Sequence, residues 1–501
     1  MPCRLARALA VLLAMLLAVL LGCLALSSPA RADDDDTRFL LEQTRRAAER
    51  RAAPEGELIA PPGFLVYEGR VHEVLTHLEQ LEPAIQIAID SGQWDRLEEF
   101  ISRYRLMKDH RPALLAMAEG LLARRRGDYA LALRRMRDAH DAAPEDGRIR
   151  LELARLWFED NQDGAAREGF SQTIASGLPG QAQAMARQYL RALDMRASWH
   201  GSLALGPGYN SNINQASGDI SCLLEMYGLC LFERKMPQAI SSGMASYELS
   251  LQRRYNLGGN HNLVLRPVSY GSVYRRKDTA ADVLIKDYSS NTAMLFLGYN
   301  YLTARNSISA TPYVEHYYRN RYSNYLAGGT QLEWRHAFNA RWQLAGSLDA
   351  KRYHHKQRAL RIASDYSQYQ GGVSLSYMPQ ANTSIYGGVD LVRKKYAVAQ
   401  ASSKEVALRA GVFHAFAGEA GIFINALGVL RFSRSDAYDG FLDARRRDRQ
   451  QVYIVSVGVN SWKIAGMTPE LRLRRSLNHS NLDWAFGFKQ TEISLLLRRN
   501  F

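Results

Sequence analysis

The sequence feature that most constrains the fold is an alternation of apolar and polar residues that begins after Ser198 and continues to the last residue, Phe501. In residues 245–257 the odd positions are mostly apolar and the even positions are polar, with Arg253 as the one break. A period of two places successive side chains on opposite faces of a β-strand. The strands of a soluble β-sandwich would alternate as well. The number of strands and the lengths of their connections must therefore distinguish a membrane barrel from a sandwich.

Fourteen alternating segments follow one another over residues 197–501. Tight turns, such as 257–259 and 417–419, alternate with generally longer loops, the longest from about 214 to 242. An even number of strands places both ends of the barrel chain on the same side of the membrane. The sheet must close on itself, because an open edge within the hydrocarbon region would leave backbone hydrogen-bonding groups unsatisfied. We therefore predict a 14-stranded antiparallel transmembrane β-barrel of a bacterial outer membrane. Its strands are expected near 199–213, 244–256, 262–274, 289–302, 307–319, 326–338, 342–353, 366–378, 383–396, 404–416, 420–433, 451–462, 467–478 and 484–501.

The polar faces of these strands carry charges of both signs, which we expect to line the lumen. The candidate lumen residues are Glu248, Arg254, Glu333, Arg335, Asp349 and Lys351. The last strand ends on Phe501, and a terminal aromatic residue resembles the signal by which the bacterial barrel assembly machinery recognises its substrates. Arg499 departs from that signal, since an apolar residue usually stands there. Expected partners are therefore the barrel assembly machinery, periplasmic chaperones, and outer-membrane lipid with lipopolysaccharide.

Residues 63–196 have a helical pattern rich in Ala, Leu, Arg and Glu, and one segment repeats with a recognisable period. Between Ala113 and Pro144, the small, aromatic and turn positions match a 34-residue tetratricopeptide unit. About three units fit, so the predicted fold class is α+β multidomain, with N-terminal all-α tetratricopeptide-like repeats before the barrel. Most motif residues build the stack, and a client would contact the concave face of each first helix. By repeat position, the candidate client-binding residues are Leu114, Met117, Leu121, Arg124, Arg125, Arg148, Leu151, Arg155 and Phe158.

The chain starts with an apolar run from Ala8 to Leu26, preceded by Arg4 and Arg7. Together with the small residues that follow, this order is typical of a secretory signal peptide over 1–32, cleaved between Ala32 and Asp33. Two alternatives remain open: an inner-membrane anchor, because the run is just long enough to span a bilayer, and lipidation of Cys23 after a loose lipobox. Residues 33–62 are expected to form a flexible leader.

Outside the signal region only Cys222 and Cys230 remain, and both lie in the longest predicted loop. In an exported protein such a pair is expected to close the loop as a disulfide. The chain carries a formal net charge of +14, which suits anionic lipid or acidic clients. No P-loop, metal-ligand set, cofactor motif or nucleic-acid motif accompanies that charge, so nucleic acid, metals and cofactors are not expected. The run Arg445, Arg446, Arg447 is expected to face solvent or lipopolysaccharide.

An enzymatic function is not expected. No Ser lies in a G-x-S-x-G turn. Isolated pairings of the twelve His with Ser are unavoidable by chance, and His261, His316 and His414 are interpreted as interface or lumen residues.

Several motifs occur in an order that is similar to one known family. They are the repeat segments 118–124, 127–130, 148–155 and 158–160, the segment 210–214 after the first strand and the segment 287–290 before the fourth. Over about residues 60–501 the chain resembles the surface lipoprotein assembly modulator family, also called type XI secretion. The resemblance implies an outer-membrane translocon whose periplasmic repeats bind client proteins and whose barrel passes them to the cell surface. Clients in that family are surface lipoproteins or secreted haem- or metal-acquisition proteins.

The main alternative function is an exopolysaccharide export porin, which also joins tetratricopeptide repeats to a barrel. Such exporters generally carry many more repeats than the three that fit here, and their lumen must suit a sugar chain. The mixed signs of the predicted lumen residues favour the protein translocon.

Overall fold

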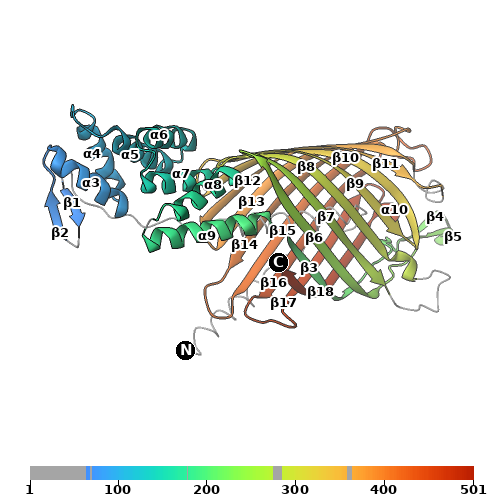
Figure 1. The fold of residues 1–501 in the computed structure, drawn as a ribbon. Coiled ribbons are helices and arrows are strands. Elements are labelled where there is room, and N and C mark those ends of the chain that lie inside the picture. Colours follow the sequence, from blue (N-terminus) through green and yellow to red (C-terminus); the bar gives the residue numbers. More distant parts are fainter. Residues whose placement is uncertain (1–63, 68–69, 178, 275–284, 358–363) are drawn as a thin grey trace.

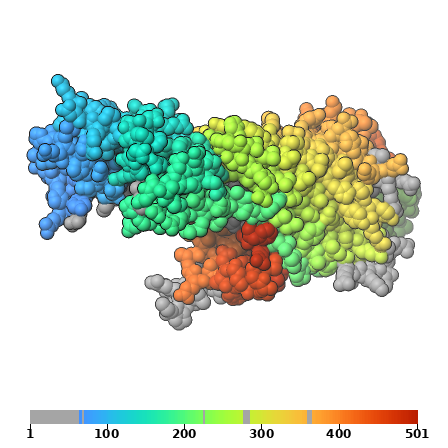
Figure 2. Space-filling view, viewed as in Figure 1, coloured from blue at the N-terminus to red at the C-terminus, as the bar shows by residue number. Residues whose placement is uncertain are grey.

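A computed structural model describes residues 64–67, 70–177, 179–274, 285–357 and 364–501 (Figure 1). The predicted signal peptide, its cleavage site between Ala32 and Asp33, and the predicted leader lie outside the described residues. No helix in the described ranges is both long and apolar enough to cross a membrane. A helical part comes first and extends as an arm from one end of a closed β-barrel (Figure 2).

Seven helices precede the barrel in the described chain and form three packed pairs followed by one single helix. The three pairs correspond to the three predicted tetratricopeptide units, and the helical-repeat prediction is confirmed. The helices are α3 (Leu78–Asp90), α4 (Trp94–Tyr104), α5 (Pro112–Arg125), α6 (Tyr129–Ala142), α7 (Gly147–Glu159), α8 (Asp163–Ala175) and α9 (Gly180–Ala197).

The middle pair shows why this sequence forms a helical hairpin. Gly127 ends the first helix with a φ of 75°, a left-handed conformation that costs glycine little. The Asp128 side chain then caps α6 by accepting a 3.0 Å hydrogen bond from the Leu131 N–H. At the crossing point, a Cβ on Gly120 would lie 3.3 Å from the Ala132 carbonyl oxygen. The small residue at that position is therefore what lets the two helices approach each other.

A short hairpin that the sequence did not indicate precedes the helices. Strands β1 (Phe64–Tyr67) and β2 (Arg70–Glu73) pair antiparallel. The Gln93 side chain accepts from the Val66 N–H at 2.9 Å and donates to the Val66 carbonyl at 2.7 Å, which adds a side-chain contact to the edge of β1. Four-residue strands are too short to give a recognisable period, so only the tertiary contact identifies them.

Fourteen strands form a closed antiparallel barrel in which sequence neighbours pair, and the pair β18–β3 closes it. This confirms the predicted barrel and its strand number. The strands are β3 (His200–Asn210), β6 (Ser242–Gly258), β7 (His261–Tyr274), β8 (Ser290–Leu302), β9 (Asn306–Arg319), β10 (Tyr322–Ala337), β11 (Trp342–His355), β12 (Tyr366–Gln380), β13 (Thr383–Tyr396), β14 (Ser403–Ala415), β15 (Ile422–Ser435), β16 (Arg447–Val459), β17 (Thr468–Ser480) and β18 (Phe488–Asn500).

Three connections differ from the sequence prediction. The longest loop holds an additional hairpin, β4 (Ile220–Met226) with β5 (Leu229–Lys235). The last strand begins at Phe488 instead of near residue 484, because Asp483–Phe486 forms a helical turn, α10, whose Asp483 carboxylate accepts from the Ser480 N–H at 2.7 Å. Arg447 already belongs to β16, so the run of three arginines divides between a loop and a strand.

The two faces of the barrel wall have opposite chemistry. Outward positions expose large apolar side chains, and Leu348 and Leu391 are 60% and 61% exposed. Inward positions hold buried polar groups such as Glu315 and Lys351, whose side chains form a 2.6 Å ion pair. An apolar exterior around a polar interior suits a barrel surrounded by lipid.

The C-terminus belongs to the closing pair of strands. The Phe501 N–H donates to the Gly201 carbonyl at 3.0 Å, and the Gly201 N–H donates to the Phe501 carbonyl at 2.7 Å. Arg499 pairs in register with Leu203 and is exposed, at the end of the strand. A long cationic side chain at that level can extend its head to the membrane surface, which accounts for the one residue that departs from the terminal signal.

Candidate functional site

The third repeat is docked directly onto the barrel. The turn between α7 and α8 carries Asp160, which is 7% exposed. Its carboxylate accepts from the Asn260 side-chain N–H at 3.2 Å and from the Ala304 N–H at 3.0 Å. Asn161 donates from its side chain to the Thr303 carbonyl at 3.2 Å. The turns β6–β7 and β8–β9 thus hold the repeat domain at one mouth of the barrel, where the helices meet the strands in Figure 1.

A second polar contact joins the first turn of α8 to the barrel. Asp163 forms an ion pair with Arg254 of β6, and its other oxygen accepts from Arg196 of α9 at 3.0 Å. Arg196 also lies over the Phe158 ring, 3.6 Å from its centroid. Arg254, expected in the lumen, therefore contacts the repeat domain, and the contact fixes the last repeat and α9 against the barrel rim.

The inner wall carries four charged side chains that bridge the closing strands. Arg498 of β18 donates to Glu470 of β17 at 2.8 Å and to Glu248 of β6 at 3.2 Å. Arg472 of β17 donates to Glu470 at 3.1 Å and also pairs with Glu248. Glu470, Arg472 and Arg498 are almost completely buried, and Ala204 of β3 lies between the partner strands with no exposed surface. We call Glu248, Glu470, Arg472 and Arg498 the seam cluster.

The other predicted lumen charges pair locally along the wall. Lys351 binds Glu315, and Asp349 accepts from the Tyr313 hydroxyl at 3.0 Å. Glu333 binds Arg335 of the same strand at 2.5 Å. Because cations and carboxylates neutralise one another along the wall, the described lumen does not present a field of one sign.

The repeat-face candidates divide into two groups. Leu114, Met117, Leu121 and Leu151 lie in the packed core with at most 8% exposure, so they hold the helices together and no client can reach them. This corrects their predicted accessibility. The first helix of each unit packs along more than one face, and the sequence period does not distinguish a packing face from an open one.

The remaining five candidates lie nearer the surface and are mostly engaged. Arg124 pairs with Glu159, Arg155 with Glu152 at 2.6 Å, and Arg148 with Asp90 at 2.5 Å. Burial disfavours the charge on Arg124, but the Glu159 carboxylate outweighs it and holds the pKa of Arg124 above its ordinary value. The Phe158 ring contacts Phe170 and Tyr189 edge-on. Arg125 is exposed. A client role for these five stays a prediction.

The three histidines that the sequence analysis assigned to the interface or lumen form polar contacts with hydroxyl groups of the barrel strands. His261 contacts the Tyr299 hydroxyl at 2.6 Å, His316 the Ser323 hydroxyl at 2.9 Å, and His414 the Thr383 hydroxyl at 2.8 Å. Among the described residues, no three His, Cys, Asp or Glu side chains come together as a group that could hold a metal.

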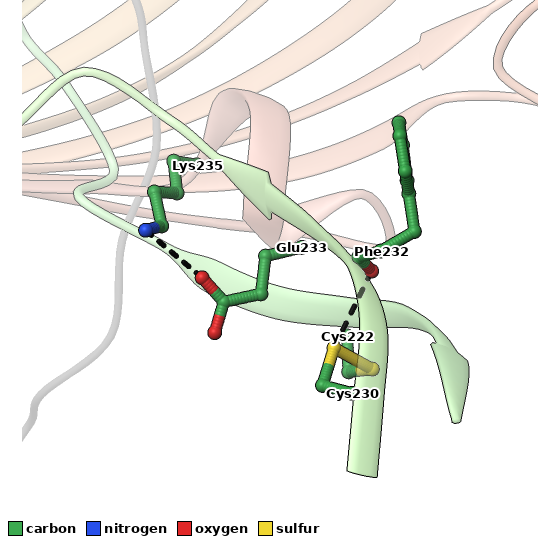
Figure 3. The surroundings of a disulfide bond; sticks show 5 residues. All are labelled: Cys222, Cys230, Phe232, Glu233 and Lys235. Atoms are coloured by element: carbon green, nitrogen blue, oxygen red, sulfur yellow. Dashed lines mark hydrogen bonds and ion pairs between the residues drawn. A yellow bond between two sulfur atoms is a disulfide. The ribbon is translucent and has the colours of Figure 1, made fainter. Parts of the chain in front are cut away.

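The β4–β5 hairpin lies at the mouth opposite the repeats, and Cys222 and Cys230 form a disulfide across it (Figure 3). Its apolar side chains are exposed: Leu229 is 68% and Phe232 is 62% accessible. Arg234 anchors the hairpin to α10 by lying over the Trp484 ring, 3.5 Å from its centroid. Sequence reasoning missed this apolar surface because it treated the whole segment as a loop.

Replacing Cys222 and Cys230 together with serine should loosen this hairpin and leave the barrel intact. Closing a loop of this length stabilises by about 2 to 3 kcal/mol in the chain-entropy description. Proteolysis of intact cells should therefore cut the double variant within residues 220–235 several times faster, while the barrel keeps its heat-modifiable gel mobility. Equal cutting rates would show that anchoring by Trp484 suffices without the disulfide.

The family model for the surface lipoprotein assembly modifier matches residues 199–501, and the model for the N-terminal tetratricopeptide repeats of the same proteins matches residues 68–170. The chain belongs to this family. Membership places the barrel in the bacterial outer membrane and the repeats in the periplasm, so the β4–β5 hairpin is extracellular.

Curated relatives align along most of their length. The chain is 27% identical to the "Hemophilin secretion modulator" of Acinetobacter baumannii, over 96% of this chain and 99% of that protein. It is 24% identical to the "Surface lipoprotein assembly modifier 2" of Neisseria meningitidis, over 82% of this chain and 84% of that protein. The "Surface lipoprotein assembly modifier" of Moraxella catarrhalis is 23% identical over 81% of this chain and 78% of that protein. As a family member the chain is a secretion and assembly factor with protein partners.

Proposed function

We propose that this chain is a translocon that receives client proteins on its periplasmic repeats and passes them through the barrel to the cell surface. The observation that carries the proposal is the docking of the repeat domain, a fold suited to binding polypeptide, onto the periplasmic turns of a barrel with a polar lumen. The relatives' names indicate two client classes: surface lipoproteins and a secreted haem-binding protein.

The lumen supports a protein client over a polysaccharide. A polypeptide presents charges of both signs together with apolar groups, and the described wall offers paired charges of both signs. The exposed apolar hairpin at the extracellular mouth adds a surface that an emerging, partly folded chain could contact before it completes its own core. The proposed movement needs no catalytic group, in keeping with a family of secretion and assembly factors.

Two partners follow from the barrel and its export. The barrel assembly machinery would recognise the strand that ends at Phe501, and periplasmic chaperones would keep both the precursor and its clients unfolded. On the repeats, Arg125 and Arg148 are the arginine candidates with the greatest exposure, and a client could contact them there.

The test uses the native bacterium with the gene deleted and complemented. Surface proteins of intact cells are cut by protease and identified by mass spectrometry, in parallel with an assay for extracellular polysaccharide. Deletion should remove a small set of lipoproteins or secreted proteins from the surface and leave them in the periplasm, while polysaccharide is unchanged. Loss of polysaccharide with a normal set of surface proteins would instead identify an exporter and refute the proposal.

A docking variant tests the structural part of the proposal. Asp160→Ala with Asn260→Ala removes the side-chain contacts of Asp160 with the barrel turns and leaves those of Asn161 and Asp163 in place, and each buried group left without its partner costs about 1 to 3 kcal/mol. Surface delivery should fall by about tenfold or more, while repeat helicity and barrel mobility on gels are retained. The matched control is Asp109→Ala, an exposed aspartate of the same domain, which should deliver clients normally. Normal delivery by the docking variant would mean that transfer does not require this contact.

A further inference from the structure

Four cations lie in one lateral row on the outside of the barrel. Arg393 of β13 pairs in register with Lys404 of β14, Lys404 pairs with Arg434 of β15, and Arg434 pairs with Arg447 of β16. The alternation of the strands places these positions on the same face as the exposed Leu391, Val406 and Phe432. We call Arg393, Lys404, Arg434 and Arg447 the basic row.

The basic row lies at the extracellular edge of the membrane-facing wall. Arg393 is near the end of β13 and Lys404 is near the start of β14, on either side of the connection that lies opposite the periplasmic turns. Below them along the strands the outward side chains are apolar, as in Leu391 and Val389 of β13. The cations are thus at the level where the hydrocarbon region ends and charged lipid headgroups begin.

Like charges opposite each other on neighbouring strands destabilise a sheet. Here the row repeats that arrangement over three successive strand pairs. Within the described chain the row forms one ion pair, between Arg393 and Asp436, with a nitrogen–oxygen distance of 2.6 Å for one of its two hydrogen bonds. The Arg393 guanidinium, with weaker help from Lys404 and Arg445, holds the pKa of the Asp436 carboxyl below its ordinary value. The single carboxylate of Asp436 does not neutralise the four cations of the basic row. An anion from outside the protein would stabilise the row.

An apolar groove of about 730 Å³ runs along the wall below two members of the row. Its upper end contains Arg393 and Lys404, and outward side chains that line it below include Leu332, Leu348, Ala350 and Leu391. At this surface Ala350 carries only a methyl group and Gly371 carries no side chain, between bulkier neighbours. A groove of this form suits an acyl chain whose headgroup lies beside the two cations.

We infer that the basic row and this groove bind the phosphorylated, multiply acylated glycolipid of the outer leaflet, with its phosphates on the cations and one acyl chain in the groove. Phosphates bind well between guanidinium and ammonium groups, and the glucosamine backbone of such a lipid carries more than one phosphate, which matches a row wider than a single cation. The outward-facing positions of strands β11–β16 carry no acidic side chain in the described chain. No carboxylate there would repel an anionic lipid, which further favours such a ligand. The site lies outside the client path and does not depend on the proposed translocation.

The test is native mass spectrometry of the full-length protein in detergent, with bisphosphorylated lipid A as the probe. The variant combines Lys404→Gln, Arg434→Gln and Arg447→Gln, and leaves the Arg393–Asp436 pair intact. The variant should bind the probe at least about tenfold more weakly than the wild type, and lipid A without phosphates should bind the wild type as weakly. A control with Arg134→Gln, Arg137→Gln and Arg341→Gln removes three exposed cations from the periplasmic side and should bind like the wild type.

Three results would overturn the inference. The first is equal binding of the probe by the variant and the wild type. The second is equal binding of phosphorylated and dephosphorylated lipid A, which would mean that the apolar groove acts alone. The third is binding of phosphatidylglycerol as tightly as lipid A, because a general attraction for anionic lipids would then explain the row. Heat-modifiable mobility of each variant on a gel confirms that the barrel is folded in every comparison.

Discussion

Replacing Glu470 with glutamine should destabilise the barrel by about 3 kcal/mol, the loss typical of removing one partner from a buried ion-pair network. Glu470 is 2% exposed and accepts hydrogen bonds from both Arg472 and Arg498. Glutamine keeps the size of the side chain but removes its negative charge, so two guanidiniums would share the single carboxylate of Glu248 in the seam cluster. Unfolding by guanidinium chloride in micelles, followed by tryptophan fluorescence, measures the change in free energy.

The control for this prediction is Glu333→Gln. Glu333 also lies on the inner wall and pairs with an arginine, but the Arg335 side chain is 43% exposed. Ion pairs with this much contact to water contribute at most about 1 kcal/mol. A similar loss in both variants would show that the seam cluster has no special role. A Glu470→Gln variant as stable as the wild type would show that water in the lumen hydrates the arginines of the seam cluster well enough to replace the lost carboxylate.

The seam cluster also shows what a sequence can and cannot predict in a barrel. Alternation identified Glu248, Asp349 and Lys351 as polar positions, because the side-chain period of a strand is two residues. It could not identify their partners, since Arg472 lies 224 residues from Glu248 and the two meet only when the barrel closes. Partner choice depends on strand register across the closing pair, and no local pattern encodes that register.

The repeat domain shows a different limit. The period of the repeats and the three units were predictable from small, aromatic and turn residues. The sequence did not predict which side of each first helix stays open. Leu114 and Leu151 are packing residues in the structure. Arg254 shows the same limit at the domain boundary. The alternation assigned it to the polar face of β6 and to the lumen, but its partner Asp163 comes from another domain.

The docking of the repeat domain and the closure of the barrel involve the same strand, β6. The repeats contact β6 through Arg254, and Glu248 of β6 reaches Arg472 and Arg498 across the closing pair. One strand therefore connects the repeat domain with the seam cluster. A change in the position of the repeats on client binding would act first on β6, the strand that pairs with β3 beside the closing pair.

The ladder between β18 and β3 is interrupted near its middle. Register partners join Ser494 to Gly208 and Leu497 to Leu205, but none is found for Gly206 and Pro207 between them. Proline has no N–H to donate to the ladder. The backbones nevertheless approach closely, since a Cβ on Gly206 would lie 1.9 Å from the Leu495 carbonyl oxygen.

Gly206→Ala should therefore disrupt closure more than any other single methyl group added to β3 or β6. The added carbon meets backbone atoms of β18 that cannot rotate away, so the two strands must separate, at a cost of about 3 kcal/mol or more. Much less of the variant should reach the folded form in membranes, and its compact gel mobility should be lost at a lower temperature. Gly243→Ala on the next strand is the matched control, because a Cβ there would meet nothing closer than the Gly208 carbonyl oxygen at 3.9 Å. If Gly206→Ala assembles as well as this control, the seam is already open enough to accept a methyl group, and lateral separation of β3 and β18 then becomes an accessible motion of the native barrel.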